Sequence, residues 1–188
     1  MSQPANLKKK KKKWISLLST KDFGNVELGE TFVDENEKVI GKVVCANMMN
    51  LTRDMKKQNV QLYFIVKEIT NNEAHTELYA YEMVPAFLKR VTKKAKERVD
   101  HSFELLSQDN ITFRIKPIMM TKGIAHHSVA TSLRKAVQDS IAATAKKTTF
   151  ADLMKSVIAG NLQKDLKLEL KKIYPLNSCM IKSLRKAQ

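Results

Sequence analysis

The chain has 188 residues, 43% of them hydrophobic, and its formal net charge is +15. This length suits one domain with a substantial core, and the hydrophobic fraction excludes a wholly disordered chain. The positive excess indicates a polyanionic partner, with nucleic acid ahead of an anionic membrane. No apolar run approaches the roughly 18 residues of a membrane-spanning helix, and no secretory signal is visible, so we expect a cytoplasmic protein without a membrane partner.

The N-terminal end is polar and basic. Residues 1–13, which include six consecutive lysines, are predicted to form a flexible arm. The fold is expected to begin at Trp14, whose ring is predicted to pack in the core rather than against a base. Residues 14–18 suit a short strand, and Gly29 together with the acidic stretch Asp34-Glu35-Asn36-Glu37 indicates loops.

Alternating apolar residues predict a hairpin in the middle of the chain. Residues 59–70 and 74–83 are its two strands, and Asn71-Asn72 is its turn. Before it, residues 38–46 are rich in β-branched side chains and predict another strand, in which Gly41 suggests a bulge or a close backbone approach.

From Pro85 onward, the spacing of the apolar residues changes. Residues 85–99 begin with a proline and predict a helix, after which 99–107 and 111–120 predict a second hairpin. Pro117 suggests that the end of this hairpin lies at an edge or a bulge.

The last third is predicted to be helical. Helices are expected over residues 127–147, 150–160 (capped by Thr149) and 161–174, followed by a strand and a basic tail over 176–188. Strands that come first and helices that come last indicate an α+β fold. We therefore expect one domain over 14–188 with three regions, which are a strand-rich part (14–122), a helical part (127–173) and the C-terminal strand and tail (176–188).

Motifs for catalysis and cofactor binding are missing from the sequence. There is no phosphate-binding glycine loop and no metalloprotease or hydrolase signature. Cys45 and Cys179 lack metal-ligand spacing and are interpreted as reduced, core-type residues. The adjacent pair His126-His127 has no helical-spacing partner for a metal. We expect no enzyme activity, no metal and no cofactor.

Positive charge is the remaining signal. Two dense clusters, Lys8–Lys13 and the basic residues of 89–98, are expected to contact phosphates, whereas short pairs such as Lys146-Lys147 and Lys171-Lys172 stay open between phosphate contact and a solvated face. If about eight phosphates were neutralised, log affinity would fall with log salt at a slope of roughly −6 to −7. No run of exposed aromatics is predicted, so base-specific readout is not indicated.

Several segments resemble one family. The run KKKKW is followed by Gly29-Glu30-Thr31, by Leu51-Thr52-Arg53-Asp54, by Ala74-His75-Thr76-Glu77 leading to Glu82-Met83, and by KKIYPLNSCMIKSLRK near the end. In this order, from about residue 11 to 186, they resemble the S3Ae family of small-subunit ribosomal proteins of archaea and eukaryotes, in its short, archaeal-type form. Arg134-Lys135 lies where the family has a basic pair on a helix.

The resemblance implies a structural constituent of the small ribosomal subunit that contributes to translation. It implies an antiparallel β-barrel-like core from the N-terminal two-thirds and a helical C-terminal part. It also implies binding to small-subunit rRNA on the platform, near the mRNA exit, beside neighbouring platform proteins. The alternative is a free RNA-binding regulator or ribosome assembly factor.

The charge clusters and the resemblance together give the candidate rRNA-binding residues. They are Lys8, Lys9, Lys10, Lys11, Lys12, Lys13, Arg53, Lys89, Arg90, Lys93, Lys94, Lys96, Arg98, Lys122, Arg134, Lys135, Lys182, Arg185 and Lys186.

Overall fold

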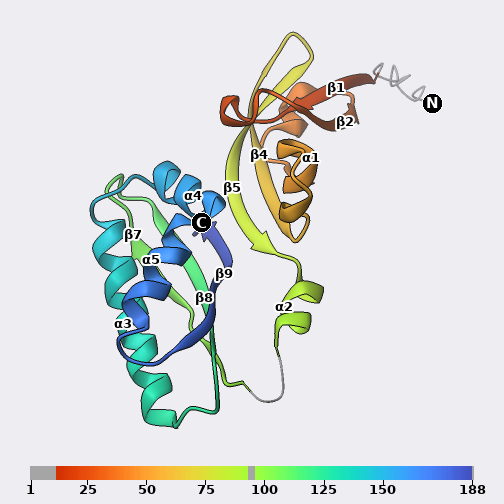
Figure 1. Ribbon diagram of the computed structural model, residues 1–188. Helices are drawn as coiled ribbons and strands as arrows, with labels where there is room; N and C mark the ends of the chain where they lie inside the picture. Colours follow the sequence, from red (N-terminus) through yellow and green to blue (C-terminus); the bar gives the residue numbers. More distant parts are fainter. Residues whose placement is uncertain (1–11, 93–95, 188) are drawn as a thin grey trace, which may run out of the picture.

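The computed structural model describes residues 12–92 and 96–187, and Figure 1 shows two halves that meet along strands β5 and β9. The strands are β1 (Lys13–Leu18), β2 (Glu27–Val33), β3 (Val43–Asn47), β4 (Val60–Thr70), β5 (Glu73–Met83), β6 (Arg98–Asp100), β7 (Phe103–Leu106), β8 (Thr112–Thr121) and β9 (Leu176–Lys186). The helices are α1 (Met48–Thr52), α2 (Pro85–Val91), α3 (His127–Ala145), α4 (Phe150–Ala159) and α5 (Asn161–Leu170), with short 3-10 helices η1 (Lys21–Phe23), η2 (Asn36–Val39) and η3 (Met55–Lys57). β1 to β5 and α1 form one half, and β6 to β9 with α3 to α5 form the other (Figure 1).

The hairpin of β4 and β5 is the centre of the first half. Leu62, Phe64 and Val66 alternate along β4 and are buried, as the sequence pattern predicts. Asn71 and Asn72 both have positive φ, 50° and 68°, which matches the right-handed twist of the two strands. The predicted hairpin is therefore confirmed, and β3 pairs antiparallel with β4 on its far side.

One long edge of β5 holds two different strands. Its first residues, 73–75, pair in parallel with β1, and residues 80–82 pair antiparallel with β9. The sheet order is β2-β1-β5-β9-β8-β6. In addition, β4 pairs with the other edge of β5, β3 pairs with β4, and β7 pairs with β8. C-terminal strand β9 thus connects the two halves.

The predicted α+β class is confirmed, but the antiparallel barrel is wrong. The nine strands of the described residues form one mixed sheet, because β1 and β5 run parallel, and the terminal strands β2 and β6 of the order do not pair with each other. Helices α3 to α5 lie against strands β6 to β9 (Figure 1). Part of the apolar sheet surface is therefore covered by helices rather than enclosed by closure of the sheet.

Two N-terminal segments differ from the prediction. Residues 27–33, for which no strand was predicted, form β2 and pair with β1, so Gly29, expected in a loop, lies within a strand. The strand predicted over 38–46 is divided into η2 and β3. Gly41 separates them with φ 83°, and no heavy atom lies within 4 Å of an added Cβ, so its role is a left-handed turn rather than a close approach.

Helix α2 is shorter than predicted and ends at Val91. Thr92 is extended, and its hydroxyl donates to the carbonyl of Leu88 at 2.9 Å. Residues 98–100 belong to β6, which replaces the predicted helix end.

The second hairpin forms around β8. The strand predicted over 99–107 is interrupted at His101-Ser102 and becomes β6 and β7, both paired with the same edge of β8. The register between β8 and β9 shifts at Lys116/Pro117, as expected for a proline that cannot donate to the ladder. The predicted bulge is confirmed, although it lies between β8 and β9 and not at an edge.

The three C-terminal helices are confirmed with small changes at their ends. Thr149 Oγ1 accepts from the backbone N–H of Asp152 at 3.2 Å and caps α4, and Gly160, at φ 82°, ends it. Apolar residues at three-and-four spacing, such as Leu133, Val137 and Ile141 of α3, are fully buried against the sheet.

Two predictions about core residues are wrong. The side chain of Trp14 is 62% exposed and lies beside Phe32, on the outer face of the β1–β2 pair, while its neighbour Ile15 is buried. Cys45 is exposed on β3, whereas Cys179 on β9 is buried, and both are free thiols. Burial raises the pKa of Cys179 to about 12, so that thiol stays neutral.

Candidate nucleic-acid interface

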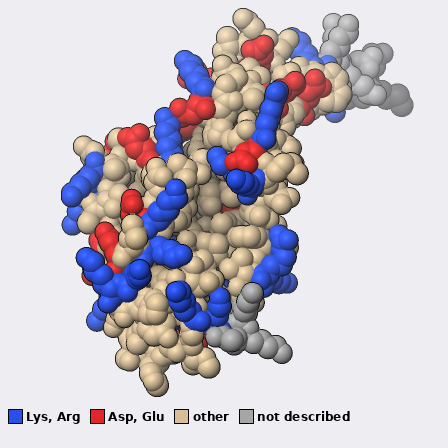
Figure 2. All heavy atoms as spheres, in the orientation of Figure 1, with Lys and Arg blue, Asp and Glu red and all other residues tan. Residues whose placement is uncertain are grey.

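The candidate basic residues are distributed over both halves. Lys8–Lys11, Lys93 and Lys94 lie outside the described residues. The others are Lys12 and Lys13 at β1, Arg53 after α1, Lys89 and Arg90 on α2, Lys96 and Arg98 at β6, Lys122 after β8, Arg134 and Lys135 on α3, and Lys182, Arg185 and Lys186 on β9. Figure 2 shows Lys and Arg side chains in separate groups over the visible face, with Asp and Glu between some of them.

Some of these residues are held by acidic partners. Arg98 donates to both carboxylate oxygens of Asp100, at 2.8 and 2.6 Å, and this contact raises the pKa of Arg98. Lys186 pairs with Glu77, and Arg185 Nη2 lies 4.0 Å from Glu82 Oε2. The last two contacts connect β9 to β5, whereas the first lies within β6. In all three, less of the positive charge is available to an external anion.

Two arginines are fixed by neutral partners. Arg134 Nε donates to the backbone carbonyl of Asp100 at 3.1 Å and so connects α3 to β6. Arg90 Nη2 donates to Asn59 Oδ1 at 3.1 Å, and its guanidinium lies 5.8 Å from the ring centre of Phe87. Neither arginine has an ion-pair partner in the described part of the chain, so both keep an uncompensated charge in a defined position.

The remaining candidates have no acidic partner. Among residues 12–92 and 96–187, no acidic oxygen lies within 4.0 Å of the side-chain nitrogens of Lys12, Lys13, Arg53, Lys89, Lys96, Lys122, Lys135 or Lys182. Unpaired cations repel one another in the folded protein, and the phosphates of a nucleic acid relieve that repulsion.

Several lysines come together at a groove beside α5, which was not predicted from the sequence. Its volume is about 550 Å³, and it is lined by Lys122, Lys164, Lys167, Leu168, Lys171, Pro175 and Leu176. We call these residues the lysine groove. Four lysines thus surround an apolar floor, in which Leu168 is 67% exposed.

Helix periodicity explains why these lysines converge. Lys164, Lys167 and Lys171 are spaced by three and four residues and share one face of the last helix, and Lys167 Nζ donates to the carbonyl of Asn177 at 2.8 Å. The opposite face carries Leu162, Leu166 and Leu170, which are buried. This spacing was readable in the sequence, yet only Lys122 of the groove was among the candidates. Lys171 belonged to a pair whose role stayed open, and Lys164 and Lys167 were missed.

The described residues form neither a metal cluster nor a membrane-spanning helix. No group of three or more His, Cys, Asp and Glu side chains in residues 12–92 and 96–187 could hold a metal ion. Within the same residues, no helix has the length and hydrophobicity needed to cross a membrane. The geometry offers positive charge and grooves, which suit an anionic polymer.

Comparison with known proteins agrees with this geometry. The model of the Ribosomal S3Ae family matches residues 5–186. The small ribosomal subunit protein eS1 of Halorubrum lacusprofundi is 28% identical over 176 residues, which cover 94% of this chain and 82% of the relative. The proteins of the same name from Natronomonas pharaonis and Saccharolobus islandicus are each 29% identical and cover 94% of this chain, with 86% and 85% of their own lengths matched.

The family match spans nearly the whole described fold, from the residues before β1 to the end of β9. Its members are ribosomal proteins and not enzymes, and its relatives named above belong to the small subunit. The chain is a member of the Ribosomal S3Ae family of small ribosomal subunit proteins.

Proposed function

We propose that this chain is a structural constituent of the small ribosomal subunit, that it binds rRNA on the platform near the mRNA exit, and that it contributes in this way to translation. Family membership supports the ribosomal role. The platform position is what the resemblance of the motifs along the chain implies. Its other partners are neighbouring ribosomal proteins of the platform.

The unpaired cations carry this proposal. Lys122, Lys135 and Lys182 lie on or beside different elements of the helical half and have no acidic partner among the described residues. Phosphates in folded rRNA are arranged in three dimensions, so a rigid protein can meet several at once without ordering itself first. The sheet and helices act as the support that holds these cations apart at fixed positions.

The lysine groove is the part of the interface with the most defined shape. Its lysines can neutralise phosphates on both sides of a strand of RNA, while Leu168 and Pro175 offer an apolar floor to a sugar or base. Lysine is a point charge with rotatable donors, so the groove positions the backbone and does not read base identity.

Sedimentation of ribosomal particles tests the proposal. A tagged chain is expressed in cells and the particles are separated on density gradients at low and moderate salt. The chain is expected in mature small subunits at full occupancy at both salt concentrations. A chain found only in precursor particles or in free RNA fractions would favour the assembly-factor alternative and would refute a structural role.

A further inference from the structure

The outer face of the β1–β2 pair carries two large aromatic rings side by side. Trp14 on β1 lies directly opposite Phe32 on β2, and the ring centres are 4.8 Å apart with an interplanar angle of 36°. Trp14 is 62% and Phe32 49% exposed. We call this pair the aromatic platform.

The core does not require these rings. Along the same strands Ile15, Leu17 and Val33 point to the opposite face and are buried in their own apolar cluster. Cross-strand aromatic contact alone stabilises a hairpin modestly, and here it leaves about half or more of each side chain in contact with water. Two adjacent exposed aromatic rings of this size are typical of a surface that receives a partner.

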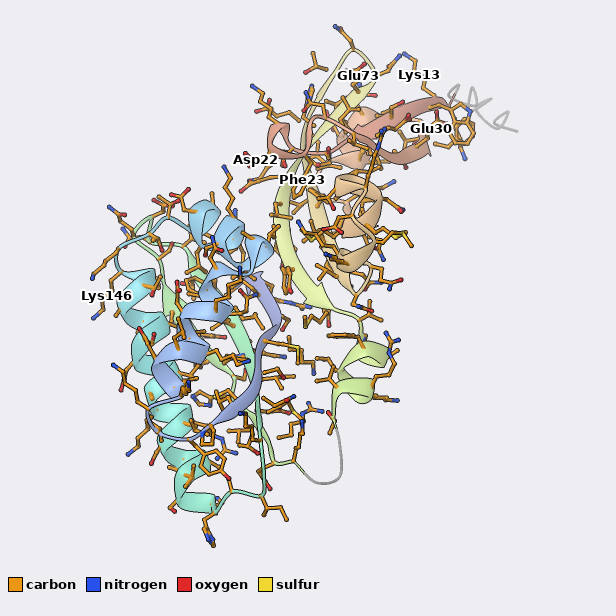
Figure 3. All side chains as sticks on the ribbon, viewed as in Figure 1. Lys13, Asp22, Phe23, Glu30, Glu73 and Lys146 are labelled. Atoms are coloured by element: carbon orange, nitrogen blue, oxygen red, sulfur yellow. The ribbon has the colours of Figure 1, made fainter. Side chains whose placement is uncertain are left out.

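Positive charge lies at one end of the platform. Lys12 Nζ is 5.6 Å from the ring centre of Phe32. Lys13 alternates with Trp14 along β1 and so belongs to the opposite face, with Ile15 and Leu17. Glu30, opposite Ser16, lies at the other end, and Figure 3 shows Lys13 and Glu30 on the two neighbouring strands. A flat apolar surface with a cation at one end matches a nucleotide, in which a flat base is attached to an anionic phosphate.

We infer that the aromatic platform stacks an unpaired nucleobase of RNA, with Lys12 at the adjoining phosphate. This inference rests on the proposed function, because it takes RNA as the partner, and it adds where and how a single-stranded nucleotide is held. Stacking uses the face that every base has, so the platform accepts any sequence that leaves a base unpaired. Lys12 moves from the Phe32 ring to the phosphate when the base arrives.

Trp14 reports directly on this site, because it is the only tryptophan in the chain. The full-length protein is titrated with single-stranded oligouridine and, separately, with an RNA duplex that has the same number of phosphates. Stacking of uracil quenches indole fluorescence, whereas the paired bases of a duplex have no free face. The expected result is quenching by oligouridine and binding of the duplex without quenching.

Substitutions at Phe32 separate stacking from charge. Phe32→Leu removes a ring, keeps the surface apolar and leaves every lysine in place. Its affinity for oligouridine is expected to fall roughly 5- to 150-fold, the loss that corresponds to one stacked base, while duplex affinity stays unchanged. Phe32→Tyr is the matched control and is expected to retain binding. Thermal unfolding of both variants checks that the fold is intact.

The outcomes distinguish this inference from the proposed function. If both RNAs bind without quenching, or if Phe32→Leu binds oligouridine normally, the platform does not stack a base although the protein still binds RNA. If neither RNA binds, both the inference and the proposed function are refuted. Photo-crosslinking of Trp14 only to a protein in intact small subunits would assign the platform to a protein neighbour and overturn the inference.

Discussion

Arg53 has an unusual backbone conformation for its residue type. Its φ of 54° and ψ of 22° place it in the left-handed region at the end of α1, where its N–H donates to the carbonyl of Met49 at 2.8 Å. Glycine and asparagine adopt this conformation far more readily than arginine does. An exposed arginine held there at an energetic cost is consistent with a role in binding.

Replacing Arg53 with asparagine should separate stability from binding. The free energy of unfolding of Arg53→Asn is expected to stay constant or rise by about 1 kcal/mol, because strain is relieved. Affinity for an rRNA fragment is expected to fall, because a cation is lost. Chemical denaturation and filter binding measure the two quantities.

Arg53→Lys is the control for charge in that experiment. It keeps both the strain and the positive charge, so its stability and RNA affinity are expected to resemble those of the native chain. A loss of stability in Arg53→Asn, or full RNA binding by it, would contradict this interpretation of Arg53.

At the scale of elements, helix α5 presents opposite faces to the core and to solvent. Leu162, Leu166 and Leu170 are buried, whereas Lys164, Lys167 and Lys171 line the lysine groove. Because both sets follow the helical repeat, a single helix can join the core and present a row of charges at the same time.

Removal of the three α5 lysines should change the salt dependence of RNA binding. The triple variant Lys164→Gln, Lys167→Gln, Lys171→Gln is expected to reduce the magnitude of the slope of log affinity against log salt by roughly 2 to 3. The matched control replaces Lys38, Lys67 and Lys155, which pair with acidic residues at 2.9 to 3.2 Å. Equal effects of the two variants would show that net charge acts without the groove.

A second element-scale feature is the contact at Glu77, on β5. Burial raises the pKa of Glu77, but the hydrogen bonds from Lys186 on β9 and Lys67 on β4 together outweigh it and lower that pKa below the ordinary value of 4.5. A carboxylate with a lowered pKa in the folded state stabilises the fold above its unfolded pKa. This stabilisation is lost as the pH falls through the folded pKa.

Glu77→Gln should therefore reduce the acid sensitivity of the fold. The free energy of unfolding of the native chain is expected to fall more steeply below about pH 4.5 than that of Glu77→Gln, and the two curves should run parallel near neutral pH. Urea unfolding at a series of pH values measures this. The effect is modest, because Glu77 is partly exposed. Identical acid dependence in the two proteins would show that the contact does not matter.

Element identity was largely predictable from sequence, and the reasons are local. Alternation identified β4 and β5, and three-and-four spacing with Thr149 and Gly160 identified the C-terminal helices. The prediction failed where a short segment depends on its partner. Residues 27–33 become a strand only because β1 lies beside them, and residues 38–39 form part of a 3-10 helix despite their β-branched neighbours.

On the scale of the whole molecule, β9 determines the architecture. The last strand of the chain lies between β5 and β8, so residues near position 80 pair with residues near position 185. Side-chain periodicity gives no information on such long-range pairing, because any apolar strand of suitable length could occupy that place. The barrel-like core was an expectation from the family resemblance, and the position of β9 between β5 and β8 belongs to an open mixed sheet instead.

The sequence predicted the chemical class of the partner, but it did not predict which basic residues are free to bind it. Net charge and the basic clusters indicated an anionic partner, yet Arg98 and Lys186 proved to be paired with Asp100 and Glu77. The exposure of Trp14 could not be deduced either, because a lone tryptophan after a lysine run suits a core anchor as well as a surface ring. Only the tertiary structure distinguishes a paired cation from a free one.

The central claim is that unpaired cations of this fold contact rRNA in the small subunit, and a lysine–RNA crosslinking map on intact subunits tests it most directly. Crosslinks to platform rRNA are expected from the lysine groove, which contains Lys122, Lys164, Lys167 and Lys171, and not from the ion-paired Lys38, Lys67 and Lys155. If the groove lysines of a subunit-bound chain gave no rRNA crosslinks, or if only the ion-paired lysines did, the claim would be contradicted.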